Sequence, residues 1–120
     1  TASFILYAYV RIQSIQKKIG IDMEALIKEP KISLSHPSEI SLALHLRRFG
    51  EYLTAMDQEL LPNRLTDYLY TLAEKFHGFF RDCHVDGDEN QNERLILIEL
   101  ARRIIAKGLN ILGIDTIDKM

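Results

Sequence analysis

The sequence has little of several features that mark whole classes of protein. Cys83 is its single cysteine, so no internal disulfide can form and a reducing, cytoplasmic setting is expected. The longest apolar run extends only from Phe4 to Val10, which is too short to cross a bilayer. No secretory signal pattern is visible. We therefore expect neither a membrane partner nor a disulfide-bonded secreted domain.

An excess of positive charge is also missing. The chain has 15 Lys and Arg residues against 17 Asp and Glu residues, a formal net charge of −2. Nonspecific binding to nucleic acid depends on neutralising phosphates with surplus Lys and Arg. We therefore expect no DNA partner and no general affinity for nucleic acid, so that any contact with RNA must be local.

Motifs that carry catalysis are absent as well. The sequence contains no glycine-rich phosphate loop, no paired-cysteine motif and no Ser–His–Asp arrangement in a recognisable context. Carboxylates do occur in pairs, at Asp57 with Glu59 and at Asp86 with Asp88. The first pair falls on a predicted helix and the second in a hydrophilic turn, so solvated surface explains both. We expect no catalytic residue in this chain, which favours a binding function.

Two candidate metal sites fail on spacing. The acidic run from Asp86 to Glu93 has the composition of a calcium loop but not its glycine at position six or its glutamate at position twelve. His77, Cys83 and His84 are possible zinc ligands, but Cys83 continues an apolar stripe, and structural zinc sites usually need four suitably spaced ligands. We expect no metal and no cofactor in this chain.

What the sequence does have is helical periodicity. Its 120 residues, 47% apolar and 27% charged, suit one globular domain spanning residues 1–120. An apolar stripe in the first segment predicts a helix that Gly20 ends, and Asp22 can cap a short helix through about Lys28. The stripe consists of Ile5, Ala8, Ile12, Ile15 and Ile19.

Three longer helices follow. Pro37 fits the first turn of one and Pro62 the first turn of the next, which ends near His84, and Gly113 closes the last. No segment alternates like a half-buried strand. We predict an all-α fold, an antiparallel bundle of four main helices plus one short helix. The three stripes are Leu42, Leu46, Phe49, Leu53, Met56 and Leu60; Leu65, Leu69, Leu72, Phe76, Phe79 or Phe80, and Cys83; and Leu95, Ile98, Ala101, Ile105, Leu109 and Leu112.

The chain begins with Thr1, and helical periodicity starts almost at once, so we expect it to be part of a longer protein. Phe4, Tyr7 and Arg11 share one face of the first helix, about a quarter-turn from the isoleucine stripe. Such a row could stack on unpaired RNA bases and contact phosphate. Alternatively, Phe4 and Tyr7 could pack against a neighbouring helix, with Arg11 as an ordinary surface charge. The basic pairs Lys17–Lys18, Arg47–Arg48 and Arg102–Arg103 could likewise be phosphate contacts or ordinary solvated surface.

Several segments together resemble the anticodon-binding domain of arginyl-tRNA synthetases. They follow the order of that family over nearly the whole chain: Phe4-Ile5-Leu6-Tyr7-Ala8-Tyr9-Val10-Arg11, Ser35-His36-Pro37-Ser38-Glu39, Leu61-Pro62-Asn63-Arg64-Leu65, Tyr68-Leu69-Tyr70 with Leu72-Ala73, Phe76, Phe79-Phe80 and Cys83, and Leu112-Gly113-Ile114 through Met120. The resemblance implies the C-terminal domain of a class I synthetase that uses ATP, with Mg, to attach arginine to its tRNA.

The same resemblance implies that the chemistry lies elsewhere in the parent enzyme. Neither a His-x-Gly-His signature nor a Lys-Met-Ser-Lys-Ser-type loop occurs here, so this chain should be inactive by itself. Its implied partners are the anticodon loop of arginine tRNA and the parent's catalytic domain. Because every arginine codon has a central G, the matching anticodons share a central C that one domain could inspect.

By resemblance, Phe4, Tyr7, Arg11 and the terminal Met120 meet the anticodon loop. Their chemistry suits this role, since aromatic rings stack on bases, a guanidinium holds a base edge or phosphate, and methionine gives adaptable apolar contact. The sequence departs from the family at position 4, often tyrosine, and at position 9, often histidine. Phe4 can stack on a base but has no hydroxyl to hydrogen-bond its edge.

Two other functions remain open. The chain could be a helical module that docks another protein or another domain without RNA specificity, and one surface could serve both purposes. RNA binding should weaken with salt and with loss of the central C, whereas docking predicts neither effect. Intrinsic enzymatic activity is a third hypothesis, which an aminoacylation or ATP–pyrophosphate exchange assay tests. We expect no activity in either assay.

Overall fold

The computed structural model describes residues 2–55, 59 and 61–116, and within them it contains helices and no strand. This confirms the predicted all-α class. The helices are α1 (Ala2–Ile19), α2 (Met23–Lys28), α3 (Pro37–Arg47), α4 (Phe49–Ala55), α5 (Leu61–Asp82) and α6 (Gln91–Ile111).

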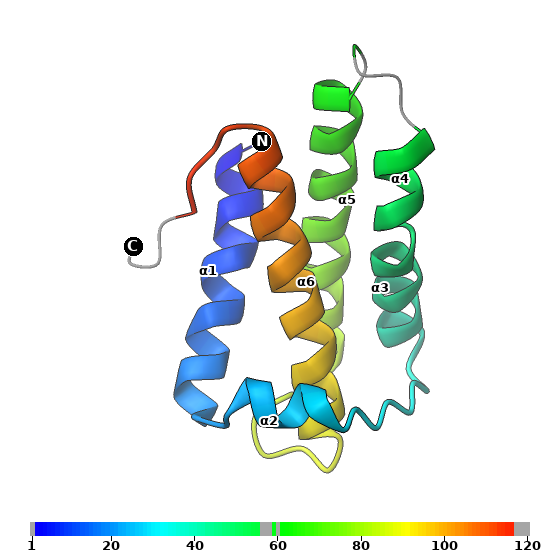
Figure 1. Ribbon diagram of the computed structural model, residues 1–120. Coiled ribbons are helices and arrows are strands. Elements are labelled where there is room, and N and C mark those ends of the chain that lie inside the picture. The colour runs from blue at the N-terminus through cyan, green and yellow to red at the C-terminus, as the bar shows by residue number, and fades with distance from the viewer. Residues whose placement is uncertain (1, 56–58, 60, 117–120) are drawn as a thin grey trace.

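Figure 1 shows a bundle in which α3 and α4 continue one another as a single column beside α5. The short α2 crosses one end of the bundle, where it packs against α6. Along the chain, α1, the α3–α4 column, α5 and α6 alternate in direction, whereas α1 and α5, which also pack together, run in the same direction. The predicted arrangement of four main helices and one short helix is therefore confirmed, with α3 and α4 sharing one position.

The predicted third helix differs in one respect, because it is interrupted at Arg48. There the backbone N–H bonds to the carbonyl of His45, three residues back, which ends α3 before Phe49 starts α4. The apolar stripe continues across the break, since Leu46 and Phe49 are both buried. The last members of that predicted stripe, Met56 and Leu60, lie outside the described residues.

The local signals at helix ends act as predicted. Asp22 accepts a hydrogen bond from the backbone N–H of Glu24 at 3.1 Å and caps α2. Gly20 and Gly113 follow α1 and α6 with φ values of 74° and 76°, a left-handed conformation that favours glycine. Gly20 thereby marks the end of α1, which carries the predicted site residues Phe4, Tyr7 and Arg11.

The core lies where the stripes meet. Ile5, Ala8 and Ile12 of α1 are fully buried, whereas Ile15 and Ile19 at the end of that stripe are only partly covered. On α5 the core residue is Phe79, and Phe80 is partly exposed, which decides the alternative that the sequence left open. The other fully buried members of the predicted stripes are Leu42, Leu65, Leu69, Leu72, Phe76, Leu95, Ile98, Ala101, Ile105 and Leu109.

A buried ion pair fixes the start of α3 to α6. Glu39 accepts hydrogen bonds from the backbone N–H groups of Ser35 and His36 at 3.1 and 2.8 Å, and His36 caps the helix in return. The second carboxylate oxygen of Glu39 accepts a hydrogen bond from Arg94 Nε at 2.9 Å, and Arg94 also donates to the His84 carbonyl at 2.6 Å. Burial alone would raise the pKa of Glu39, but these hydrogen bonds outweigh burial and lower it.

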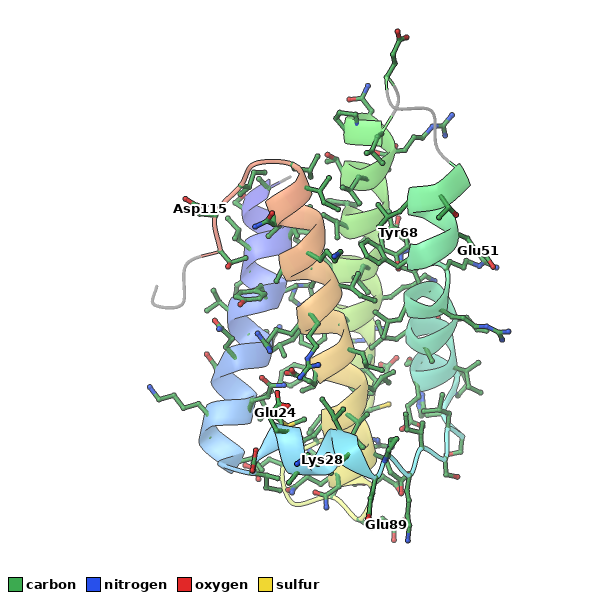
Figure 2. The ribbon with its side chains drawn as sticks, viewed as in Figure 1. Glu24, Lys28, Glu51, Tyr68, Glu89 and Asp115 are labelled. Atoms are coloured by element: carbon green, nitrogen blue, oxygen red, sulfur yellow. The ribbon has the colours of Figure 1, made fainter. Side chains whose placement is uncertain are left out.

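His45 and Tyr68 join the α3–α4 column to α5. The Tyr68 hydroxyl donates to the His45 carbonyl at 2.6 Å, His45 Nε2 lies 3.0 Å from the Tyr68 carbonyl oxygen, and the two rings stack at 4.1 Å. Figure 2 shows Tyr68 on α5 at this junction. Burial raises the pKa of Tyr68 and lowers that of His45, which favours the neutral form of each.

Close packing of α6 on α5 depends on Gly108. A Cβ atom built at Gly108 would lie 2.8 Å from both terminal methyl carbons of Leu69, a fully buried side chain. We expect Gly108→Ala to destabilise the chain by about 1–3 kcal/mol through overpacking, although alanine favours a helix by about 1 kcal/mol. Urea unfolding measures the change.

Gly50 supplies the matched control for that substitution, because it lies in α4 and a Cβ there meets nothing within 4 Å. We expect Gly50→Ala to be neutral or stabilising. Equal stability of the two alanine variants would show that α6 can shift away from Leu69 without loss.

Candidate nucleic-acid interface

The candidate site begins with one face of α1. Steps of three and four residues place Phe4, Tyr7 and Arg11 in a row, because residues so spaced are neighbours on a helix surface. Tyr7 is 54% exposed, whereas Phe4 and Arg11 are partly covered. The prediction that this row lies off the isoleucine core is therefore confirmed for Tyr7, and the other two side chains lie at the edge of the seam between helices.

Helix α5 supplies the covering side chains. Because α1 and α5 run in the same direction (Figure 1), successive positions on α1 meet successive positions on α5. The Phe4 ring lies 4.9 Å from the Tyr70 ring and 5.2 Å from the His77 ring, and Tyr7 stacks on His77 at 5.2 Å. We call this surface the α1–α5 patch; it consists of Phe4, Tyr7 and Arg11 of α1 and Tyr70, His77 and Phe80 of α5.

Arg11 is held at the far end of the α1–α5 patch. Its guanidinium carbon lies 4.5 Å from the centre of the Phe80 ring and 5.7 Å from that of Tyr7, both within cation–π range. Its Nη1 lies 3.4 Å from His77 Nδ1. The positive charge thus sits on an aromatic platform and is not a freely moving surface charge.

Both explanations of the α1 row describe part of what the structure shows. Phe4 packs against α5, as the packing hypothesis predicts, while Tyr7 and the 37% exposed Tyr70 keep ring surface open to a partner. Arg11 differs from that hypothesis, because it lies over the Phe80 ring and is not an ordinary surface charge. Tyr9, which the sequence left unassigned, is 3% exposed and belongs to the core. Met120 lies outside the described residues.

The α5 residues of the patch were missed as site residues. Tyr70, His77 and Phe80 share one side of that helix, at spacings of seven and three residues. The sequence shows this spacing, but the apolar stripe of the same segment predicted core packing, and His77 was a candidate only for zinc binding. The signal that could have identified them is an aromatic row on α5 that matches the row on α1.

Burial, and to a smaller extent the positive charge of Arg11, lowers the pKa of His77. The imidazole is therefore neutral near pH 7. The α1–α5 patch combines stacking surfaces with one fixed positive charge, and it holds no nucleophile or general base in a catalytic arrangement. It is suited to binding flat, anionic groups.

The basic pair on α6 is occupied within the fold. Arg102 and Arg103 both donate to Glu99, with hydrogen bonds between 2.7 and 2.8 Å, and Gln16 donates to the same carboxylate at 2.8 Å. Burial would raise the pKa of Glu99, but the three donors outweigh it and lower the pKa to about 2. Arg102 and Arg103 are therefore ion-paired within the fold, and a contact of this pair with phosphate stays a prediction.

The remaining basic pairs differ from this one. Lys18 lies 3.5 Å from Asp86 in an exposed ion pair, which contributes little stability. Lys17, Arg47 and Arg48 are exposed. Since none of these belongs to the α1–α5 patch, Arg11 is the positive charge of that surface.

Cys83 and Asp88, which were considered as metal ligands, have structural roles in the fold. Cys83 is 2% exposed in the core, as its place in the apolar stripe predicts, and burial raises the pKa of its thiol. Asp88 accepts from the Asn90 N–H at 2.9 Å and lies 3.4 Å from Arg94, so the acidic turn serves the start of α6. Among residues 2–55, 59 and 61–116, no group of three His, Cys, Asp or Glu side chains could hold a metal ion.

An apolar depression of about 270 Å³ lies away from the patch, between α3, α6 and the segment before α3. Its apolar lining suits contact with another apolar surface. Its lining residues are Ile32, Leu34, Ala43, Leu46, Arg47, Leu97, Leu100 and Ile104. None of the described helices is long and apolar enough to cross a membrane.

The fold and the patch define a class, that of all-α binding domains with an aromatic, positively charged surface along the first helix. Comparison with known proteins identifies the family. Residues 5–120 match the DALR anticodon binding domain, and the chain belongs to that family.

The relatives of this chain are arginine–tRNA ligases. The arginine–tRNA ligase of Protochlamydia amoebophila is 52% identical over all 120 residues, which cover 20% of that protein. The Thermus thermophilus arginyl-tRNA synthetase structure superposes with a TM-score of 0.78 at 30% identity, covering 100% of this chain and 21% of that one. A Campylobacter jejuni structure described as an arginyl-tRNA synthetase gives a TM-score of 0.88 at 26% identity, covering 98% of this chain and 26% of that one.

The matches cover all or nearly all of this chain but only part of each relative. The chain spans about a fifth of the length of the curated relatives that it matches. It is therefore an anticodon-binding domain of the kind found in arginine–tRNA ligases, which agrees with the resemblance drawn from its sequence motifs.

Proposed function

We propose that this chain recognises the anticodon loop of arginine tRNA as the C-terminal domain of an arginine–tRNA ligase. The observation that carries the proposal is the α1–α5 patch, in which an exposed tyrosine ring and a fixed guanidinium lie side by side on a member of an anticodon-binding family. Activation of arginine with ATP and Mg belongs, in this proposal, to the catalytic domain of the parent enzyme, with which this domain is joined.

Each proposed site residue has a distinct task. Tyr7 stacks on an unpaired base through its open face, while Phe4 supports the neighbouring aromatic surface and can wedge between bases. Arg11 contacts a base edge or a phosphate. Met120 adds apolar contact from the end of the chain, an assignment that rests on the family resemblance.

The direct test is titration of a fluorescent arginine anticodon stem-loop into the chain. We expect Tyr7→Ala to weaken binding by about 5- to 150-fold, the equivalent of the roughly 1–3 kcal/mol that one stacked base contributes. Because Tyr7 is 54% exposed and lies outside the core, thermal stability should change little. Arg11→Ala should also weaken binding, and it should reduce the dependence of affinity on salt.

Arg48→Ala is the matched control, because Arg48 is an exposed arginine in the α3–α4 column and not in the α1–α5 patch. A stem-loop whose central C is replaced is the control for specificity. Equal losses with Arg11→Ala and Arg48→Ala, together with indifference to the central C, would show nonspecific charge attraction and contradict the proposal.

Docking of another domain is the second candidate function, and the apolar depression between α3 and α6 favours it. Contact made there would be insensitive to salt and to the anticodon sequence, since apolar burial drives it. Leu100 lines this depression and is 38% exposed. Stem-loop binding that survives Leu100→Ala but not Tyr7→Ala would assign RNA to the α1–α5 patch.

A further inference from the structure

His77 occupies the centre of the α1–α5 patch. Its ring lies 5.2 Å from the rings of both Phe4 and Tyr7, and its Nδ1 lies 3.4 Å from Arg11 Nη1. It thus contacts all three members of the α1 row, although it belongs to α5, 66 residues from Arg11 along the chain. A side chain in this place can set how the row is presented to a partner.

The hydrogen bond between Arg11 and His77 fixes which imidazole nitrogen carries the proton. A guanidinium can only donate hydrogen bonds, so Nδ1 must be the unprotonated acceptor and the proton of the neutral ring lies on Nε2. Nε2 is buried and has no hydrogen-bond partner among the described residues. The polar function of this ring is therefore directed through Nδ1 to Arg11.

We propose that His77 is a positioning residue for anticodon recognition, whose Nδ1 orients the Arg11 guanidinium while its ring face supports Tyr7. This inference rests on the proposed function, since it assigns a role within the same site. His77 need not touch the RNA itself. Its effect is to hold two groups in a binding geometry before RNA arrives, which lowers the entropic cost of ordering them on binding.

Protonation of His77 would disrupt this arrangement. A protonated Nδ1 cannot accept from Arg11, and the ring would then place a second positive charge beside the guanidinium. Arg11 and Tyr7 are the ionisable groups of α1 that face His77, and Phe76 beside it on α5 carries no charge. The contribution of Arg11 to RNA binding should therefore decrease as the pH falls and His77 gains a proton.

Two substitutions separate the acceptor from the ring. His77→Phe keeps an aromatic face for Tyr7 but removes the acceptor, while the side-chain oxygen of His77→Asn can take the place of Nδ1 without a ring. We expect His77→Phe to bind the arginine anticodon stem-loop about tenfold more weakly, as for loss of a hydrogen bond to a charged group. Adding Arg11→Ala to His77→Phe should then weaken binding little further, and His77→Asn should restore part of the affinity.

Two readouts distinguish positioning from simple packing and need no His77 variant. The stem-loop affinity of the unsubstituted chain divided by that of Arg11→Ala should decrease as the pH is lowered from 8 to 5.5. Only the unsubstituted chain has an Arg11–His77 hydrogen bond to lose when His77 gains a proton. In NMR titrations without RNA, Arg11→Ala should raise the pKa of His77, since a neighbouring positive charge is removed.

The outcomes separate this inference from the proposed function. Unchanged stem-loop binding by His77→Phe with a persistent defect in Arg11→Ala, independent effects of the two substitutions, or an unmoved pKa of His77 would each overturn the positioning role. Absence of stem-loop binding by the unsubstituted chain would instead overturn the proposed function, while the NMR titration still reports on the Arg11–His77 link.

Discussion

Arg94→Met is expected to destabilise the chain by about 3–5 kcal/mol, as for other substitutions that break a buried ion pair from one side. Methionine matches the length of the arginine but cannot donate hydrogen bonds. Glu39, which is 1% exposed, would keep its backbone donors and lose the cationic partner of its second oxygen. The His84 carbonyl would lose its 2.6 Å donor as well. Chemical denaturation at pH 7 measures the loss.

A double-substitution cycle shows whether the uncompensated charge is the cause. Glu39→Gln removes the buried charge but leaves a side-chain oxygen that can still cap α3. In the Glu39→Gln background, Arg94→Met should therefore be less harmful, by about 1 kcal/mol or more. Strictly additive effects would contradict a direct coupling between the two side chains.

Arg81→Met is the matched control for the arginine itself. Arg81 forms an ion pair with Asp82 at 3.0 Å, but its side chain is 77% exposed, and exposed ion pairs contribute little stability. The shortest N–O distances of the two pairs, 2.9 and 3.0 Å, are similar, and the pairs differ in burial. If both methionine variants unfolded at the same denaturant concentration, burial of the Glu39–Arg94 pair would not govern its contribution.

Glu99 is expected to give the second large effect, as a dependence of stability on pH. Its pKa is lowered from 4.5 to about 2 in the folded chain. Unfolded chains therefore bind a proton more readily, and the contribution of Glu99, roughly 3 kcal/mol, is fully present above about pH 5. It decreases as the pH falls through 4.5 toward 2, and it is lost below about pH 2, where both states are protonated.

Comparison of the unsubstituted chain with Glu99→Gln isolates this contribution. The difference in unfolding free energy between the two should be constant from pH 7 to about pH 5 and should fall by about half or more by pH 3. Glu24→Gln is the control, because Glu24 accepts from Arg103 in the same cluster but its side chain is 78% exposed. A Glu99→Gln difference that persists undiminished to pH 3 would contradict the lowered pKa.

The buried carboxylates Glu39 and Glu99 show that local sequence patterns do not reveal which charged residues are buried. Glu39 pairs with Arg94 across 55 residues, and Glu99 binds Gln16 across 83. In the sequence each is one of many acidic residues on a helix, and nothing nearby marks it as buried. Burial of a charge is decided by which helices meet, a property that periodicity within one helix does not contain.

The candidate site was predictable in part. Spacing on α1 placed Phe4, Tyr7 and Arg11 on one face, and the family resemblance named them. The partner row on α5 was not predicted, because α1 and α5 are brought together, in the same direction, by the bundle as a whole. The sequence suggested His77 only as a metal ligand, whereas the packing of α1 on α5 places it at the centre of the α1–α5 patch.

The sequence by itself determined the helices, because a repeat near 3.6 residues, the Asp22 cap, the first-turn Pro37 and the glycines after α1 and α6 all act within a few residues along the chain. Tertiary structure decided the burial of Glu39 and Glu99 and the meeting of Arg11 with His77. Each of these depends on contacts between distant segments, whose energies arise only when the helices have packed.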